Sequence, residues 1–207
     1  MRLELATPAG PAWADLDRPR NPVALLVLTH GAAGGVETRD VLAVRTAAGD
    51  ADVAVALLTQ PFRVAGRRAP PAPSVQDEAW LAALAALRGR PGLGALPLVV
   101  GGRSNGARVA CRTADASGAS GVVALAFPVH PPGRPDKSRL DELKLPTVPV
   151  LVVQGERDPF GMPPRARGRR VVVLAGADHA LRTHTDVLAR EVSAFVTSTV
   201  ARANVKT

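Results

Sequence analysis

The sequence predicts an α/β fold in which helices flank a doubly wound, mostly parallel sheet. Two observations predict it: short apolar runs alternate with alanine-rich amphipathic stretches, and a polar or glycine-rich cluster directly follows most of the apolar runs. Regular alternation of strand and helix requires right-handed crossovers between parallel strands. In open sheets of this kind ligands bind beyond the carboxyl ends of the strands, so we expect a functional site there.

The individual elements follow from hydrophobic patterning and from glycine and proline positions. Residues 1–6 are expected to form an edge strand, and the proline-rich connection 8–22 has room for a second one. The continuous apolar run 23–28 is typical of a strand that is buried on both faces of a parallel sheet. The further expected strands are 52–58, 96–101, 121–127, 148–153 and 170–174, and the expected helices are 39–48, 79–87, 107–114 and 185–203. The stretch 59–74, with its four prolines, is expected to be irregular.

Length and composition indicate one globular domain that covers residues 1–207. A chain of 207 residues is large enough to bury a substantial core. Hydrophobic residues make up 46% and charged residues 21%, which is ordinary for such a domain. Because aromatic residues make up only 3%, the core must be built from valine, leucine and alanine.

The net charge of +8 does not by itself indicate a nucleic-acid-binding protein. The positive residues are almost all arginines and are scattered, and their denser groups have no interleaved aromatic residues for base stacking. We therefore predict no nucleic-acid partner, while a preference for anionic substrates or surfaces stays open. The denser groups are Arg63, Arg67 and Arg68, and Arg165, Arg167, Arg169 and Arg170.

Several classes of protein are disfavoured by what the sequence lacks. The single cysteine, Cys111, excludes an intramolecular disulfide and is expected to be a buried structural thiol. No apolar run is long enough for a signal peptide or a membrane span, so we predict a cytoplasmic protein without a membrane partner. Four dispersed histidines and one cysteine give no metal-ligand spacing, and we expect no metal and no cofactor. No oligomeric state is predicted.

The most informative motif is Gly102-Arg103-Ser104-Asn105-Gly106, which lies between an expected strand and an expected helix. A G-x-S-x-G sequence at such a junction is the nucleophile elbow of an α/β-hydrolase fold. The flanking glycines suit a strained, crowded turn on which a Cβ atom would collide with neighbouring backbone. The motif therefore predicts a minimal α/β-hydrolase fold with Ser104 as the nucleophile.

A serine nucleophile needs a base and a carboxylate that orients the base, and the fold supplies them in the chain order Ser, Asp or Glu, His. Asp158 follows the penultimate expected strand and His179 follows the last one. We predict His179 as the general acid and base and Asp158 as the orienting carboxylate. The rival carboxylates are Glu156 and Asp178, and the rival base is His184.

Acyl transfer also needs backbone donors for the developing oxyanion. One donor is expected to be the N–H of Asn105, the residue after the nucleophile. The small-residue loop after the first long strand, residues 30–35, is expected to supply the other, from Ala32 or else Ala33. His30, in the same loop, is interpreted as a hydrogen-bonding residue that stabilises the loop.

Beyond these motifs, the chain resembles the small serine-hydrolase-like proteins near dienelactone hydrolase. It looks most similar to the branch that contains testis-expressed and NSL-complex-subunit relatives and many bacterial hydrolases. The more specific segments are Arg-Val-Ala-Gly-Arg-Arg and Pro-Val-His-Pro-Pro. The matching segments cover residues 29–35, 62–70, 101–108, 127–133, 155–161 and 176–179.

The resemblance implies the fold and the triad, and it implies less about the substrate. Dienelactone hydrolase proper has a cysteine nucleophile where this chain has Ser104, so its substrate is not carried over. We predict a serine hydrolase that cleaves a small ester or related acyl bond. The alternative is a non-enzymatic interaction protein on the same fold. Because no insertion is long enough for a large lid, we expect an open cleft lined by Phe62, Arg63, Phe127, His130 and Phe160.

Overall fold

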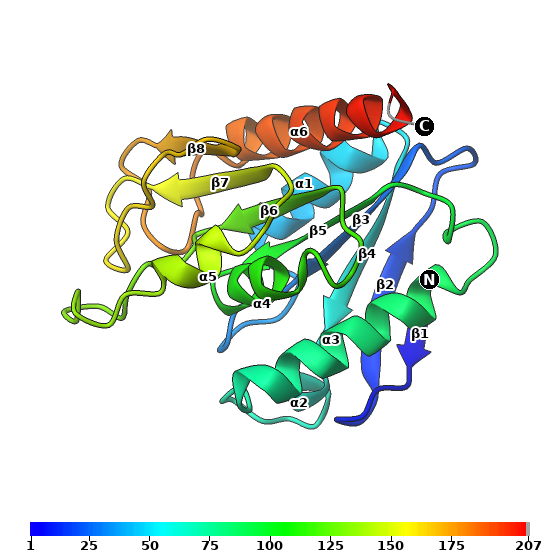
Figure 1. The fold of residues 1–207 in the computed structure, drawn as a ribbon, viewed down its shortest axis with the longest axis horizontal. Helices are drawn as coiled ribbons and strands as arrows, with labels where there is room; N and C mark the ends of the chain where they lie inside the picture. Colours follow the sequence, from blue (N-terminus) through cyan, green and yellow to red (C-terminus); the bar gives the residue numbers. More distant parts are fainter. Residues whose placement is uncertain (206–207) are drawn as a thin grey trace.

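The computed structural model describes residues 1–205 as an eight-stranded sheet with helices on both faces (Figure 1). The strands lie in the spatial order β1-β2-β4-β3-β5-β6-β7-β8. They are β1 (Arg2–Leu5), β2 (Ala12–Asp17), β3 (Ala24–Thr29), β4 (Val53–Thr59), β5 (Leu98–Arg103), β6 (Gly121–Leu125), β7 (Val150–Gly155) and β8 (Arg169–Leu174).

The sheet is parallel except at one edge. β2 pairs antiparallel with both β1 and β4, whereas every pair from β4 to β8 is parallel. The strands from β3 to β7 are apolar and are buried almost throughout, as expected for strands covered on both faces, whereas the edge strand β8 is only partly buried. The predicted fold class, an α/β-hydrolase fold with a mostly parallel sheet, is confirmed.

Helices divide the apolar side chains of the sheet between two cores. α1 (Arg39–Gly49) and α6 (Thr185–Val205) pack side by side on one face. α3 (Pro73–Arg88), α4 (Asn105–Thr113) and the short α5 (Leu140–Lys144) cover the other face. Each face of the sheet therefore has its own buried hydrophobic cluster. The helices cover the faces of the sheet and not the ends of its strands, so polar side chains can gather there.

Two short helices and one helix start differ from the sequence prediction. α5 and α2 (Pro61–Val64) are single turns, too short to give a helical period in the sequence. α3 begins at Pro73 rather than at residue 79. Proline is favoured in the first turn of a helix because its fixed φ suits the helix and its missing N–H is not needed there. Pro73 therefore starts a helix where we expected it to prolong a loop.

The order of the strands places a crevice beside β3. β3 lies between β4 and β5, so the chain leaves β3 to one side for β4 and then crosses over to the other side for β5. The loops after β3 and β5 therefore separate at the carboxyl edge of the sheet. This is the topological switch point at which open α/β sheets bind their ligands.

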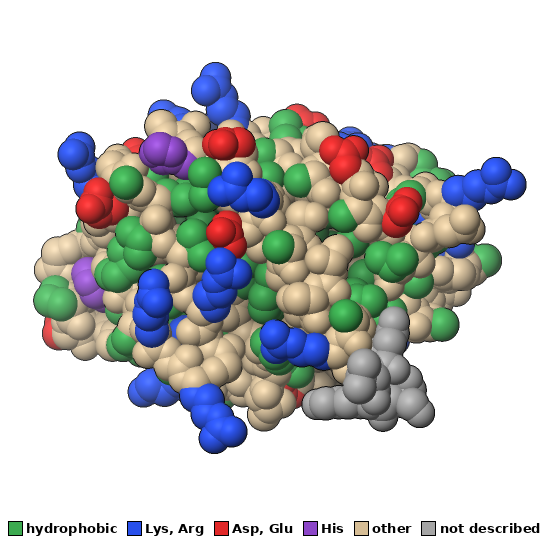
Figure 2. Space-filling view, turned by 90° about the horizontal axis from the view of Figure 1, so that it is seen from above, with side chains coloured by type: hydrophobic (Ala, Val, Ile, Leu, Met, Phe, Trp, Pro, Cys, Tyr) green, Lys and Arg blue, Asp and Glu red, His purple; other side chains and the backbone are tan. Residues whose placement is uncertain are grey.

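The surface carries charges of both signs. On the face seen from above in Figure 1, lysine and arginine side chains stand apart from one another, with acidic and apolar groups between them (Figure 2). The scatter of arginines along the sequence thus corresponds to a scatter on this face. Within residues 1–205, no helix has both the length and the apolar character that a membrane crossing requires.

The contact between α1 and α6 yields a stability prediction. Leu188 on α6 is fully buried, whereas Leu42 on α1 is 37% exposed. Leu188→Ala is expected to lower the free energy of unfolding by about 2–5 kcal/mol, because it leaves a cavity in the core. The matched control Leu42→Ala should cost less than about 1 kcal/mol. Urea denaturation measures both, and equal losses would contradict this assignment of the two faces.

Candidate active site

Ser104 lies on a strained turn between β5 and α4. Its φ of 53° and ψ of −110° fall in a region that non-glycine residues rarely adopt. A Cβ atom on Gly102 would lie 2.7 Å from the Thr29 carbonyl oxygen, and one on Gly106 would lie 2.8 Å from the same oxygen. Both glycines are therefore required by the close approach of β3 to this turn.

Ser104, His179 and Asp158 form a continuous chain of hydrogen bonds. The Ser104 Oγ lies 3.0 Å from His179 Nε2, and His179 Nδ1 lies 2.8 Å from Asp158 Oδ2. An ionised carboxylate only accepts hydrogen bonds, so in the neutral imidazole Nδ1 carries the proton and Nε2 is the acceptor. In this arrangement the Ser104 hydroxyl donates to His179. The structure thus brings together three residues that the sequence placed after three different strands.

Asp158 is held by several donors besides the histidine. Its side chain is fully buried. The Gln154 side-chain amide donates to Oδ2 at 2.8 Å, and the backbone N–H of Phe160 donates to Oδ1 at 2.9 Å. The same Gln154 amide also reaches the Gly161 carbonyl oxygen at 2.9 Å. The carboxylate therefore has a fixed orientation and charge-assisted hydrogen bonds on both oxygens.

His179 is fixed from two further directions. The Phe160 ring stacks on the imidazole with the ring centroids 4.1 Å apart. Arg103 Nη2 donates to the His179 carbonyl oxygen at 2.8 Å, and Arg103 Nε lies 3.2 Å from Asp40 Oδ2. The Asp40 side chain is only 1% exposed. A partly buried ion pair therefore anchors the backbone of the loop that carries the histidine.

The rival residues have other partners. Glu156 accepts a hydrogen bond from the backbone N–H of Gly176, and Asp178 accepts one from the backbone N–H of Ala180. His184 contacts the Ala175 carbonyl oxygen and is exposed. None of these contacts joins Ser104. Of the acidic and histidine candidates, Asp158 and His179 are the pair that the structure places beside the serine.

His30 stabilises the loop that follows β3. The backbone N–H of Gln60 donates to its Nε2 at 3.0 Å, so Nε2 is unprotonated, and Nδ1–H donates to the Gly31 carbonyl oxygen at 2.8 Å. The ring is fully buried and packs edge-on against Phe62. Burial lowers the pKa of His30 to about 4. The interpretation of His30 as a loop-stabilising residue agrees with these contacts.

A cavity of about 390 Å³ adjoins Ser104 and His179. The loop after β3 supplies one wall, and α4 begins at another with Asn105. Ala32 and Asn105, the expected oxyanion donors, both line this cavity, and so does Ala33. The first N–H groups of a helix have no partner inside the helix, so the start of α4 offers donors at this place.

The expected cleft residues are placed in different environments. Phe160 lines the cavity, whereas Phe62, Arg63, Phe127 and His130 do not belong to its lining. Phe127 is completely buried in the core under α3 and α4, and Phe62 packs on His30. His130 lies against Gly161, and Arg63 bonds to the Arg67 carbonyl oxygen. With so few aromatic residues in the chain, these phenylalanines fill the interior instead of facing a ligand.

The structure gives less support to a cysteine nucleophile or to a metal site. Cys111 is buried, and burial raises the pKa of its thiol to about 12, which keeps it protonated and unreactive. Among the described residues, no group of three or more His, Cys, Asp or Glu side chains could hold a metal ion.

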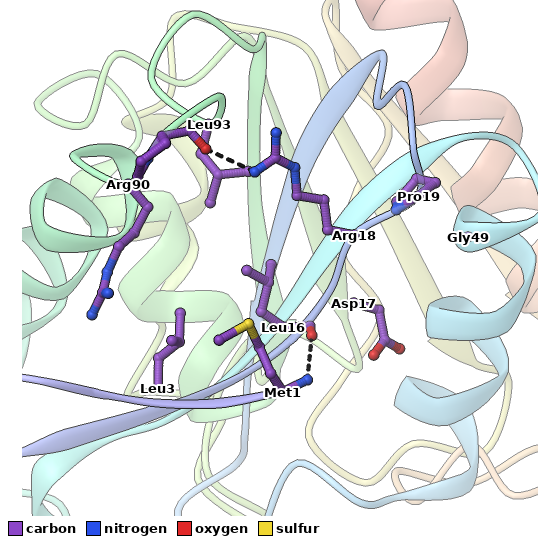
Figure 3. Close-up of a pocket in the computed structure, with 10 residues that line it drawn as sticks. Met1, Leu3, Leu16, Asp17, Arg18, Pro19, Gly49, Arg90 and Leu93 are labelled. Atoms are coloured by element: carbon purple, nitrogen blue, oxygen red, sulfur yellow. Dashed lines mark hydrogen bonds between the residues drawn. The ribbon is translucent and has the colours of Figure 1, made fainter.

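A larger cavity, of about 760 Å³, lies away from Ser104, between the strands β1 and β2 and the loop that precedes β5 (Figure 3). Its walls are mostly apolar, with Met1, Leu3 and Leu16 pointing inward. Arg18 is engaged there by the Pro91 carbonyl oxygen. The cavity contains no histidine, serine or cysteine, so the smaller cavity is the one with acid–base chemistry.

Sequence patterns did not identify Gln154, Arg103 or Arg139 as site residues. Gln154 is a fully buried amide within an otherwise apolar strand. Because buried polar groups need hydrogen-bond partners, this exception to the apolar pattern could have marked Gln154 as a site residue. Arg103 occupies a variable position of the serine motif, directly before Ser104, so the motif gave it no role. Arg139 follows a loop of exposed residues, and nothing in the sequence near it indicates that it lines the cavity.

Comparisons with known proteins identify the family of the chain and the likeness of its fold. A family model described as an alpha/beta hydrolase domain matches residues 22–201. Among curated proteins, none matches the chain in sequence.

Three solved structures illustrate the likeness in fold. Est1E from Butyrivibrio proteoclasticus has a TM-score of 0.77 at 16% identity, over 97% of this chain and 99% of that chain. A serine hydrolase without a lid from Xanthomonas campestris has a TM-score of 0.74 at 20% identity, over 96% and 94%. Dienelactone hydrolase from Anabaena variabilis has a TM-score of 0.74 at 16% identity, over 96% of each chain. At these identities the likeness concerns the fold.

The buried His30 predicts a pH dependence of stability. Its pKa is about 4 in the folded protein against 6.5 in the unfolded chain, because burial disfavours the charged ring. The unfolded chain therefore takes up the proton first as the pH falls, and the stability that His30 contributes is complete above pH 6.5 and is lost between pH 6.5 and pH 4. The loss at pH 4 should be about 3 kcal/mol.

Urea denaturation at pH 7, 5 and 4 checks this, with His30→Gln as the comparison. Glutamine keeps an acceptor for the Gln60 N–H but does not titrate. Between pH 7 and pH 4 the free energy of unfolding of the wild type should fall by about 3 kcal/mol more than that of His30→Gln. If the free energy of unfolding changes with pH to the same extent in both proteins, His30 is not held neutral in the folded state.

Proposed function

Because the chain belongs to the alpha/beta hydrolase family, we propose that it is a serine hydrolase that cleaves a small ester or a related acyl bond. The observation that carries the proposal is the hydrogen-bonded chain from Ser104 Oγ through His179 to Asp158 Oδ2. A serine hydroxyl becomes an effective nucleophile when a neighbouring base can accept its proton. These contacts support such a role for Ser104, on a turn of the nucleophile-elbow type.

The proposed reaction proceeds in two steps. His179 Nε2 accepts the Ser104 proton while Oγ attacks the carbonyl carbon, and the imidazolium then protonates the leaving alcohol to leave an acyl-serine. In the second step His179 takes a proton from water, the hydroxide attacks the acyl-serine, and the proton returns to Ser104. Asp158 stabilises the imidazolium in both steps and keeps Nδ1 protonated.

In this proposal the oxyanion is stabilised by backbone N–H groups at the start of α4 and in the loop after β3. Asn105 and Ala32 are the proposed donors, since both border the cavity beside Ser104. Gly31 supports this placement, because a Cβ atom there would come within 3.4 Å of the Ser104 Cβ. The loop therefore approaches the serine closely enough to share one bound carbonyl group.

Finer assignments come from the sequence, through its resemblance to a family and through its composition and length. We place the chain among small dienelactone-hydrolase-like serine hydrolases, in the branch with testis-expressed and NSL-complex-subunit relatives. The proposed substrate is a small molecule, and the proposed location is the cytoplasm. Residues 1–207 would act as one hydrolase domain, although 206–207 lie outside the described residues.

A fluorophosphonate probe tests the nucleophile. Wild-type protein should be labelled and Ser104→Ala should not, because the probe reacts with activated serines. Turnover of p-nitrophenyl esters by Ser104→Ala should fall by several orders of magnitude in kcat. The control Ser138→Ala, at an exposed serine, should behave like wild type. Folded wild-type protein that is neither labelled nor active would favour a non-enzymatic interaction protein on this fold.

A further inference from the structure

The cavity beside Ser104 is cationic. Its lining contains three arginines, Arg103, Arg108 and Arg139, and among the described residues that form it there is no aspartate or glutamate. The rest of the lining consists of small or apolar residues with Ser104, Asn105 and His179. A ligand in this cavity therefore meets guanidinium groups and no carboxylate.

Two of the three arginines are already neutralised. Arg103 pairs with the buried Asp40 and also donates to a backbone carbonyl group. Arg108 donates from Nε and Nη2 to the two carboxylate oxygens of Glu142, at 2.6 and 2.7 Å. A bidentate pair of this kind satisfies both partners. These two arginines are thus structural charges at the edge of the cavity.

Glu142 is already shared by two arginines. Its Oε1 also lies 3.4 Å from Nη1 of Arg112, which itself pairs with Asp77 at 2.6 Å. Two arginines and two carboxylates therefore balance one another on this side of the sheet. Among the residues that the structure describes, Arg139 has no carboxylate within salt-bridge distance and no side-chain hydrogen bond, and the Glu142 contacts belong to Arg108 and Arg112.

The backbone of Arg139 is nevertheless held in place. Its backbone N–H donates to the Val129 carbonyl oxygen at 2.7 Å, and it is the residue directly before α5. Burial, followed by repulsion from Arg108, lowers the pKa of its guanidinium, and the weaker attraction of Glu142 does not offset them. Both effects raise the free energy of the charged group, and a bound anion would relieve both.

We propose that Arg139 binds a carboxylate of the substrate, so that the preferred substrate is a small ester with a carboxylate group near the scissile bond. The proposal rests on the proposed hydrolase function and specifies its substrate class. One unbalanced positive charge matches the single charge of a carboxylate better than the larger charge of a phosphate monoester. The planar guanidinium can hold the two carboxylate oxygens in a bidentate manner.

This contact would also contribute to catalysis. Binding energy from a part of the substrate that does not react can orient the reacting carbonyl group against the nucleophile. A cavity of about 390 Å³ accommodates an ester of only modest size, so an anion held at Arg139 stays close to Ser104. Arg139 is therefore assigned as a specificity-determining residue, with Ser104, His179 and Asp158 performing the reaction.

Two pairs of esters test the proposal and distinguish the two sides of the scissile bond. For the leaving-group side, 3-carboxyphenyl acetate is compared with 3-carbamoylphenyl acetate. For the acyl side, phenyl 4-carboxybenzoate is compared with phenyl 4-carbamoylbenzoate. Each carbamoyl compound has nearly the same shape as its partner but no charge, and each rate is divided by that of spontaneous hydrolysis. The measured quantity is the ratio of kcat/KM within each pair.

Wild-type protein should prefer the carboxylate in at least one pair. Arg139→Gln should lower that ratio by about 10- to 100-fold, the range expected when a hydrogen bond to a charged group is lost. Arg139→Lys should give an intermediate ratio, because a lysine keeps the charge but loses the planar pair of donors. Arg134→Gln, which removes an exposed arginine of the same loop, should keep the wild-type ratio.

A binding measurement separates failure of this proposal from failure of the hydrolase proposal. Titration calorimetry of Ser104→Ala protein with 4-carbamoylbenzoate and with terephthalamide requires no turnover. The anion site is supported if Ser104→Ala protein binds 4-carbamoylbenzoate but not terephthalamide, and if the double variant Ser104→Ala/Arg139→Gln binds neither. This result would hold even if no ester is hydrolysed. Equal turnover within both ester pairs, or a ratio that Arg139→Gln does not change, overturns the proposal even if Ser104 is the nucleophile.

Discussion

The close approach of β3, β5 and the start of α4 around Ser104 is the constraint on which the rest of the site depends. Gly102 and Gly106 lie against the backbone of Thr29, and Gly31 lies against Ser104 itself. Side chains at these glycines would push the strand and the helix apart. Because they are absent, the chain can hold Ser104 in a strained conformation at the point where the strand order reverses. The strain is maintained by the surrounding sheet, which is buried on both faces.

The remaining site residues reach Ser104 because β6, β7 and β8 continue the sheet in parallel register. Asp158 and His179 follow β7 and β8, and their loops meet at the same edge as the serine. Gln154, Phe160 and Arg103 then fix the carboxylate, the ring and the loop backbone in turn. Each of these contacts limits the freedom of a group that the proposed reaction needs in one orientation. Preorganisation of this kind reduces the reorganisation that the transition state requires.

Much of this arrangement could be predicted from the sequence, because strands buried on both faces leave clear apolar runs and the serine motif marks its own turn. The chain order and the strand-end positions pointed to Ser104, Asp158 and His179 but left Glu156, Asp178 and His184 as rivals, and the hydrogen bonds of the folded chain join the first three. Contacts between distant residues could not be predicted. The pairing of Arg103 with Asp40 and the buried position of Phe127 depend on which face a side chain takes after its strand ends. Hydrophobic periodicity carries no information about that choice once the regular element is over.

The central claim is that an acyl group is transferred to Ser104, and intact-mass spectrometry of the protein mixed with p-nitrophenyl acetate and quenched in acid tests it most directly. If Ser104 is the nucleophile, the protein should show a transient increase by the mass of one acetyl group, located by peptide mapping on residue 104 and formed together with a burst of p-nitrophenol. Steady turnover of the ester without any adduct, or with the acetyl group on another residue, would show that Ser104 is not the nucleophile.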